Sequence, residues 1–290
     1  MRHRWGMCRL FGMTGGPQRV SATFWLLEAP DSLARQSRRD PDGTGLGVYD
    51  AAGAPTVIRD PIAAYRDRRF AEQAREVRSR TFIAHVRFAS TGAVSVENTH
   101  PFLLERRLFA HNGVIQGLDE LDAHLGDALR MVHGETDSER FFALVTAETA
   151  RRRGDVTAGL IAAARWVAAE LPLFALNVIL VSATELWALR YPETHDLQVL
   201  ERRPRGRHLD HASAAGSIRV RSGDLADRPA VIVASEPMDE DPGWYSLASG
   251  ELLHVGPDLT VRRELILPDP PAYPLTIEDL QGRAAASQTA

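Results

Sequence analysis

Apolar residues along the chain follow two patterns, which predict different elements. Short runs rich in β-branched and aromatic residues predict strands at residues 8–13, 41–50, 80–91, 107–115, 176–193, 229–237 and 251–267. Apolar residues spaced near 3.6 positions predict helices at residues 21–39, 61–80, 118–132, 134–154 and 156–172. The segment 176–193 is long enough for two strands, so we expect a hairpin there.

The order of these elements indicates the fold class. Strands come first, helices cluster in the middle, and strands return near the end. This order is not the strict strand–helix alternation that builds a parallel sheet. We therefore expect an α+β protein in which helices cover the outer faces of the sheets. Pro30 divides the first helical segment, and we expect Ser32 to cap its second piece.

Composition and charge narrow the range of partners. The chain has 290 residues, a formal net charge of -4 and a pI of about 6.2, so nothing favours a nucleic-acid partner. No apolar run in the sequence approaches the roughly 18 residues that a membrane span needs. The basic start MRHRWG is not followed by the apolar stretch of roughly 7–15 residues found in secretory signals. We therefore expect a cytoplasmic protein that binds neither nucleic acid nor membrane.

The chain contains one cysteine, Cys8, which directly follows Met7. One cysteine excludes an intrachain disulfide and fits a reducing compartment. A lone cysteine is more often a small buried hydrophobe than a catalyst. If translation starts at Met7 and that methionine is removed, Cys8 carries a free α-amine with an ordinary pKa of roughly 7.7–8.0. That amine can take the thiol proton, so two roles stay open: a packing residue or an N-terminal nucleophile.

Arg87 stands late in the otherwise apolar strand segment 80–91. An unpaired buried guanidinium is very costly, so this side chain must find an anion or reach solvent. The simpler role is a structural ion pair or a surface position. The functional alternative is a fork that binds a substrate carboxylate through two parallel hydrogen bonds.

Asn112 and Gly113 stand within the strand segment 107–115. Asn-Gly between apolar residues is a strong signal for a two-residue hairpin turn, so we expect the strand to break there. The same pair offers an alternative, in which the Asn112 amide and the Gly113 N–H stabilise a developing oxyanion. Glycine suits this role because it lets the backbone approach a ligand closely.

The segment GETDSERFF begins the helix predicted at residues 134–154. Thr136 and Glu139 have the spacing of a capping box. Asp137 then lies in the first helical turn, where a carboxylate is favourable. The same carboxylate could bind a substrate ammonium group, and the two roles are compatible.

Two other motifs favour no cofactor. The turn PDGTGLG at residues 41–47 lacks the spacing of either common nucleotide-binding glycine motif, so we expect a plain turn or a pocket wall. His208 and His211 stand three residues apart, but the sequence offers no matching third ligand. We therefore expect neither a metal nor a cofactor.

Together these motifs resemble the class II glutamine amidotransferase domain, an N-terminal-nucleophile hydrolase. The matching segments occur in the family's order within residues 7–140: Met-Cys, PDGTGLG, HVRFAST followed by ENTHPF, AHNGV, and GETDSE. The resemblance implies a four-layer αββα fold of two antiparallel sheets between helices. We expect this domain at residues 8–270, after a leader or mis-assigned start at 1–7 and before a partly disordered tail at 271–290.

The resemblance also assigns roles to single residues. It makes Cys8 the nucleophile and its own α-amine the base. It implies that Asn112 and Gly113 form an oxyanion hole. The substrate contacts it implies are Arg87 on the α-carboxylate of glutamine, Asp137 on its α-ammonium group, and Ser90, where relatives often have threonine.

The activity implied is a cysteine amidohydrolase that cleaves the γ-amide of glutamine or of a γ-glutamyl compound through a thioester. No synthase domain is recognisable after the amidotransferase segment, so we expect a stand-alone member similar to the γ-glutamyl hydrolase of the ergothioneine pathway. Two alternatives stay open. One is a glutaminase subunit that supplies ammonia to a separate synthase. The other is a non-catalytic module that binds glutamine or γ-glutamyl compounds and never exposes Cys8 as an N-terminus.

Overall fold

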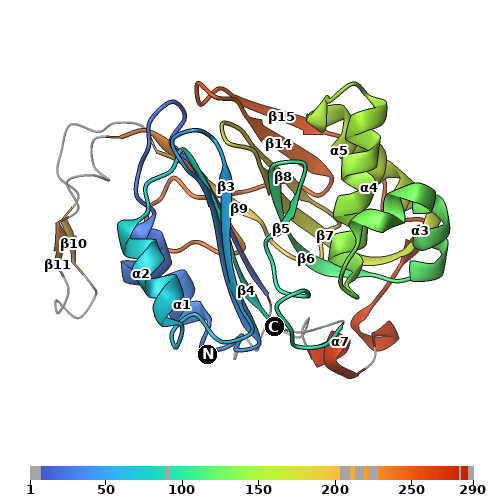
Figure 1. Cartoon of the computed structure of the whole chain (residues 1–290), viewed down its shortest axis with the longest axis horizontal. Coiled ribbons are helices and arrows are strands. Elements are labelled where there is room, and N and C mark those ends of the chain that lie inside the picture. The colour runs from blue at the N-terminus through green and yellow to red at the C-terminus, as the bar shows by residue number, and fades with distance from the viewer. Residues whose placement is uncertain are drawn as a thin grey trace.

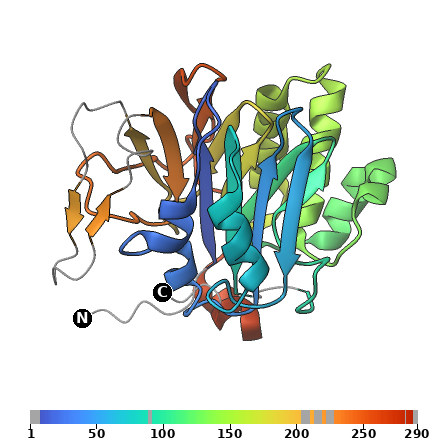
Figure 2. The same ribbon diagram turned by 60° about the vertical axis from the view of Figure 1, so that its left-hand side comes forward.

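The computed structural model describes residues 8–88, 92–202, 210–212, 219–221, 228–280 and 282–286. Two sheets face each other, and helices cover the outer face of each (Figure 1). The turned view in Figure 2 shows the N-terminal helices lying across the outer face of the first sheet. The expected four-layer αββα arrangement is confirmed.

The first sheet has seven strands, and its neighbouring strands are antiparallel. In spatial order they are β13 (Tyr245–Ser246), β9 (Gln198–Arg202), β12 (Ala230–Ala234), β1 (Arg9–Thr14), β4 (Thr81–Arg87), β2 (Gly43–Tyr49) and β3 (Pro55–Asp60). β1 lies beside β4, which pairs on its other side with β2. The segments around Cys8, Arg87 and Gly43 therefore meet at the same end of the first sheet.

The second sheet faces the first and is also antiparallel along its main path. Its strands are, in spatial order, β15 (Val261–Leu265), β14 (Glu251–Val255), β8 (Leu186–Arg190), β7 (Pro172–Val181), β6 (Arg107–Ile115) and β5 (Phe102–Leu104). The short strand β16 (Tyr273–Pro274) pairs with β7 in parallel. β7 and β8 form the hairpin predicted at residues 176–193.

Helices form the two outer layers. Those on the first sheet are the π-helix η1 (Phe24–Glu28), α1 (Leu33–Gln36) and α2 (Arg68–Glu76). Those on the second sheet are α3 (Leu118–Leu125), the 3₁₀ helix η2 (Gly126–Met131), α4 (Asp137–Arg151) and α5 (Val156–Glu170). Within the part of the chain that the structure describes, no helix has the length and hydropathy that crossing a bilayer requires.

Three apolar cores separate the layers. Phe11, Trp25 and Phe70 belong to the core between the N-terminal helices and the first sheet. Leu10 and Ile179 belong to the core between the two sheets, where Leu10 alternates with Phe11 as a strand period requires. The third core joins the second sheet to α4 and α5, whose alanine-rich segment packs inside as its composition suggests.

Two local expectations are wrong. The strand does not break at Asn112 and Gly113, because β6 continues through both residues and pairs them with Asn177 and Leu176 of β7. Ser32 occupies the N-cap position of α1, but its hydroxyl makes no hydrogen bond within the described residues. In the first case, pairing with a long partner strand outweighs the local turn preference.

Residues beyond 270 include packed elements. β16 lies beside β7, and it leads into the 3₁₀ helix η3 (Ile277–Asp279) and α7 (Gly282–Ala286). Leu280 is buried against Phe174 and Ala175. The boundary at residue 270 stays a prediction. β10 (Asp210–Ala212) and β11 (Arg219–Arg221) form a short antiparallel pair, and His208 lies outside the described residues.

Candidate active site

Cys8 lies directly before β1, at the end of the first sheet where β1 begins and β4 ends. Arg9 pairs with Val86, which places the preceding cysteine beside the last residues of β4. The thiol lies 3.2 Å from both the backbone nitrogen and the backbone oxygen of Phe88, accepting from one and donating to the other. Its residue is 7% exposed. The sulfur atom is therefore held by the backbone of the neighbouring strand.

Burial and charge keep this thiol protonated. Burial raises the pKa of Cys8 to about 12, and the nearby Asp40 carboxylate adds to the rise. The Phe88 hydrogen bond and the guanidinium groups of Arg87 and Arg9 lower the pKa, but by less. A thiol with this pKa is not a nucleophile at neutral pH, so any reaction at Cys8 requires a base within reach.

Asn112 brings the second sheet to the same place. Its side-chain amide nitrogen donates to the backbone oxygen of Cys8 at 3.0 Å, joining β6 to the start of β1. Both residues are buried. An asparagine amide has two N–H groups, and this bond uses one of them. The other N–H is what an oxyanion hole at Cys8 would need.

Gly113 is required by close packing between β6 and β7. A Cβ atom added at Gly113 would lie 1.8 Å from the backbone oxygen of Ala175 and 2.7 Å from Nε2 of His111. The same oxygen lies 3.2 Å from His111 Nε2. No side chain fits here without moving the backbone, so glycine keeps Asn112 in register beside Cys8.

Arg87 ends β4 and is 3% exposed. One of its terminal nitrogens donates to the backbone oxygen of Ala93 at 3.2 Å. Asn98 donates to the same oxygen, and Glu135 accepts from the Ala93 N–H, so this loop is held from several sides. The expected surface position for Arg87 is therefore wrong. Its contact with a substrate carboxylate stays a prediction.

Asp137 is the first residue of α4 and is buried. One carboxylate oxygen accepts from the backbone N–H of Ile115 at 2.9 Å, which ties the helix to β6 three residues after Asn112. The other accepts from the Ser138 N–H at 2.9 Å. The helix start therefore has a fixed position relative to Cys8, while binding of a substrate ammonium group by Asp137 stays a prediction.

The predicted capping box is half formed. The Thr136 hydroxyl accepts from the backbone N–H of Glu139 at 3.2 Å, as the motif requires. The Glu139 carboxylate instead accepts from the Gly134 N–H at 2.6 Å. The cap extends to the residues before α4 and fixes the loop that contains Glu135.

Five of the six predicted site residues are described. The four elements that carry or adjoin them, β1, β4, β6 and α4, are linked around Cys8. Cys8 contacts Asn112 directly, and Gly113 follows Asn112 in β6. Arg87 lies on β4, which pairs with β1, and Asp137 begins α4, which is hydrogen-bonded to β6. Ser90 lies outside the described residues. Among the residues that are described, no group of three His, Cys, Asp or Glu side chains is arranged to hold a metal.

A charged cluster beneath Cys8 was not predicted from the sequence. Arg9 is 1% exposed, and its Nε lies 3.1 Å from a carboxylate oxygen of Glu236. Arg39 lies 3.3 Å from the same Glu236 oxygen and also 3.3 Å from a carboxylate oxygen of Asp31. Asp40 is fully buried beside them. An arginine inside the apolar segment CRLFGM was the one sequence signal for this cluster.

Two buried histidines lie next along β4 and its loop. The rings of His85 and His100 are 4.3 Å apart, and their four nitrogens have no hydrogen-bond partner within the described part of the chain. Burial and, to a smaller extent, the Arg87 charge lower the pKa of His85 to about 3. Burial also lowers the pKa of His100 well below its ordinary value. Both rings are therefore neutral at pH 7 and add no positive charge near Arg87.

Glycine at position 45 permits this packing. A Cβ atom added at Gly45 would lie 1.9 Å from the backbone oxygen of His100. The loop that carries His100 thus rests directly on the backbone of β2. Most of the segment PDGTGLG is therefore not a turn, because β2 begins at Gly43, and its backbone is a packing surface for that loop.

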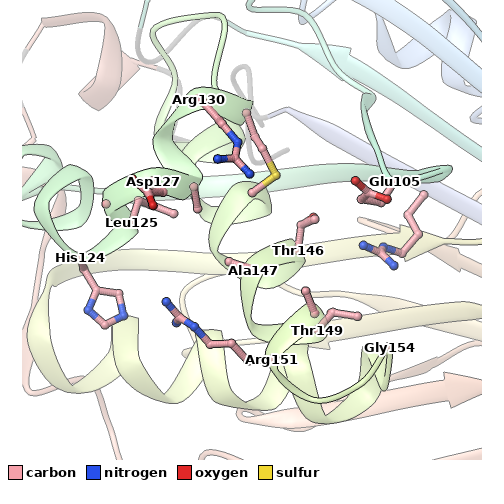
Figure 3. A pocket seen from close by; sticks show the side chains of 15 residues that line it. Glu105, His124, Leu125, Asp127, Arg130, Thr146, Ala147, Thr149, Arg151 and Gly154 are labelled. Carbon is pink, nitrogen blue, oxygen red and sulfur yellow. The ribbon is translucent and has the colours of Figure 1, made fainter.

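A separate pocket of about 690 Å³ opens between η2 and the C-terminal half of α4 (Figure 3). Arg130, Thr146 and Arg151 are among the side chains that line it. Because a helix rises 1.5 Å per residue, Thr149 lies about 18 Å along α4 from Asp137. None of the predicted site residues lines this pocket, so it is distinct from the edge at Cys8.

Comparison with known proteins gives a family and several full-length relatives. Residues 7–261 match the family of class-II glutamine amidotransferases. The chain is 30% identical over 259 residues to the gamma-glutamyl-hercynylcysteine sulfoxide hydrolase of Mycobacterium tuberculosis, covering 86% of this chain and 93% of that protein. It is 27% identical over 259 residues to the putative glutamine amidotransferase YafJ of Escherichia coli, covering 84% and 96%.

Solved structures share the fold. A glutamine aminotransferase class-II domain protein from Silicibacter pomeroyi matches with a TM-score of 0.59 at 23% identity, covering 89% of this chain and 98% of that one. The glutamine phosphoribosylpyrophosphate amidotransferase of B. subtilis matches with a TM-score of 0.62 at 18% identity, covering 90% of this chain and 50% of that one. The family match over residues 7–261, on this fold, shows that the chain belongs to the class-II glutamine amidotransferases.

Proposed function

We propose that this protein is a stand-alone amidohydrolase that cleaves the γ-amide of glutamine or of a γ-glutamyl compound, with Cys8 as its nucleophile. The observation that carries the proposal is the bond from the Asn112 amide to the Cys8 backbone oxygen at 3.0 Å. It supports the proposal because it joins the Asn112 amide of one sheet, the oxyanion donor that we propose, to the single cysteine on the other. The names of the relatives from M. tuberculosis and E. coli support the same reaction class.

The proposed reaction requires that Cys8 be the first residue of the mature chain. Its α-amine then takes the proton from the buried thiol, whose own pKa is too high for ionisation at neutral pH. The thiolate sulfur attacks the γ-carbonyl carbon, and the carbonyl oxygen takes the negative charge. The second N–H of Asn112 and the backbone N–H of Gly113 stabilise that oxyanion.

The tetrahedral intermediate collapses by breaking the carbon–nitrogen bond. The leaving nitrogen takes the proton from the α-ammonium group and departs as ammonia or an amine. A γ-glutamyl thioester stays on Cys8. Water then adds to the thioester carbonyl while the neutral α-amine accepts its proton, and glutamate is released with the thiol restored.

Recognition of the glutamyl half is assigned to Arg87, Asp137 and Ser90. The buried Arg87 guanidinium supplies a positive charge for the α-carboxylate. The Asp137 carboxylate supplies the negative charge for the α-ammonium group. This arrangement requires a substrate with a free α-amino acid end, and it leaves the group on the γ-nitrogen unspecified.

The direct test is to incubate the purified chain with glutamine and with a set of γ-glutamyl amides, and to measure glutamate release. We expect glutamate from at least one of them without any added protein. Release that appears only when a co-purifying synthase is present would favour the glutaminase-subunit alternative. Binding of these compounds without release, by a chain whose mass includes residues before Cys8, would favour the non-catalytic alternative.

Replacing Arg87 by lysine is expected to weaken substrate binding. Lysine keeps the charge but loses the planar fork that pairs with a carboxylate. Losing such a charged hydrogen bond costs roughly 1.5–3 kcal/mol, which corresponds to a rise in KM of about 10- to 100-fold. Steady-state kinetics measures this rise, with Arg68→Lys on the exposed face of α2 as the control. An unchanged KM in Arg87→Lys would remove Arg87 from the substrate site.

A further inference from the structure

The charged cluster beneath Cys8 contains more acids than bases. Arg9 and Arg39 both contact Glu236, and Arg39 also contacts Asp31. Asp40 is a third carboxylate in the same cluster, close enough that the charges of Arg9 and Arg39 lower its pKa. Among the described residues, three carboxyl groups therefore share two guanidinium groups, and the nearby Asp42 and Arg87 add one group of each kind. Carboxyl groups thus outnumber guanidinium groups by one.

Asp40 is the member without a partner. Its residue is 0% exposed, and neither carboxylate oxygen has a hydrogen-bond partner among the residues that the structure describes. A buried, unpaired carboxylate is strongly unfavourable unless a cation or donor reaches it. Burial is the main reason that the pKa of Asp40 is raised to about 7. Among the described residues, Asp40 is thus a buried carboxyl group to which no cation is hydrogen-bonded.

Backbone contacts bring the segment after Asp40 close to the start of β1. The N–H of Asp42 donates to the backbone oxygen of Arg87 at 3.0 Å, and Gly43 pairs with Arg87 as β2 begins. Phe88, the next residue of that chain, holds the thiol of Cys8. Asp40 lies close enough to Cys8 that its charge raises the pKa of the thiol.

We propose that Asp40 binds the α-ammonium group of Cys8 and is the positioning residue that holds it. This inference rests on the proposed function, in which Cys8 is the first residue of the mature chain. The α-nitrogen is one residue before Arg9, so it begins the strand that enters the cluster. One ammonium group balances the one excess carboxylate.

Asp40 would then act on the first proton transfer. When the thiol proton moves to the α-amine, a thiolate and an ammonium group form together, and no other group gains or loses a proton. A carboxylate held against the ammonium group stabilises this ion pair, because it lies nearer to the positive charge than to the sulfur. The same contact fixes the direction in which the amine faces the thiol.

The test is the pH dependence of kcat/KM in Asp40→Asn. The acidic limb of the profile reports the first proton lost by the amine–thiol pair. Asp40 raises the pKa of the thiol and would raise that of the amine, so its removal is expected to move this limb about one pH unit lower. We also expect a loss in kcat of roughly 10-fold, because the amine is no longer oriented.

Other charged side chains lie near Cys8 and Asp40, and they must stay unchanged during this test. They are Arg9 on β1, Arg39 after α1, Asp42 before β2, Arg87 at the end of β4, and Glu236 after β12, and Asp31 joins them through its contact with Arg39. Asp31→Asn is the matched control, because Asp31 belongs to the cluster but bonds Arg39. Asp31→Asn should leave the acidic limb within about 0.3 pH units of the wild type.

Several outcomes separate this inference from the proposed function. An acidic limb that does not move in Asp40→Asn, in a chain that begins at Cys8 and is active, overturns the inference alone. An active chain whose mass includes residues before Cys8 overturns the proposed function as well. Asparagine removes an unpaired buried charge, so Asp40→Asn should fold. Asp40→Ser serves as the second variant, and the same shift is expected for it.

Discussion

Replacing Cys8 by alanine is expected to lower turnover of the best γ-glutamyl substrate by more than about 10⁴-fold, because loss of a catalytic nucleophile removes the covalent route. The fold should persist. Among the described residues, the sulfur is hydrogen-bonded only to the backbone of Phe88, and a smaller side chain at the end of a strand leaves the apolar cores intact. Glutamate release by the purified variant measures the loss.

Thr14→Ala is the matched control for this variant. Thr14 is the last residue of β1, is fully buried, and accepts a hydrogen bond from the Gly16 N–H at 3.1 Å. It lies at the opposite end of the strand from Cys8, so it should cost stability but little activity. Full activity in Cys8→Ala would show that the chain hydrolyses its substrate by another route.

Replacing Gly113 by alanine is expected to have the second-largest effect. The added Cβ would lie 1.8 Å from the backbone oxygen of Ala175, so β6 and β7 must separate. Overpacking of this kind against backbone costs about 3 kcal/mol or more. In a chain of this size we expect a fall in Tm of roughly 6–12 °C, measured by thermal unfolding.

The same change should also lower kcat. Moving β6 displaces the Asn112 amide from Cys8, and loss of one oxyanion donor costs about 10²–10³ in rate. Gly256→Ala is the control, because an added Cβ there meets only Asp258 at 3.2 Å and Thr260 at 3.7 Å. A Gly113→Ala variant with the wild-type Tm and kcat would show that the close contact with Ala175 is not required.

Local sequence patterns predicted sheets with helices on their outer faces, while the four-layer arrangement came from the family resemblance. The alternation of Leu10 and Phe11 between two cores, and the alanine-rich α5, follow from side-chain period and composition. The hairpin of β7 and β8 follows from two apolar runs with a short polar link. Each of these features depends on residues close together in the sequence.

Asn112 and Gly113 show where local patterns fail. The same two residues favour a hairpin turn and an interior strand position that needs no side chain. Only the partner strand decides between these, because β7 pairs with both residues and places the Ala175 oxygen against Gly113. A single sequence contains no direct information on that pairing.

The charged cluster was missed for a similar reason. Arg9 and Glu236 are separated by 227 positions, and nothing in either local segment indicates the other. Asp40 stands in a turn whose composition predicts exposure, yet it is fully buried. Arg87 could be chosen because it interrupts an apolar strand, and Asp137 because it belongs to a helix-start motif. Asp40 fits its turn and gives no comparable signal.

The measurement that tests the central claim most directly is the mass of the N-terminal peptide after reaction with 6-diazo-5-oxo-L-norleucine, an electrophilic analogue of glutamine. If Cys8 is the N-terminal nucleophile, we expect one label per chain, on a peptide that begins at Cys8. We also expect slower labelling of Arg87→Lys. Labelling should be absent in Cys8→Ala. An active protein that carries no label on Cys8, or whose labelled peptide retains residues before Cys8, would contradict the account.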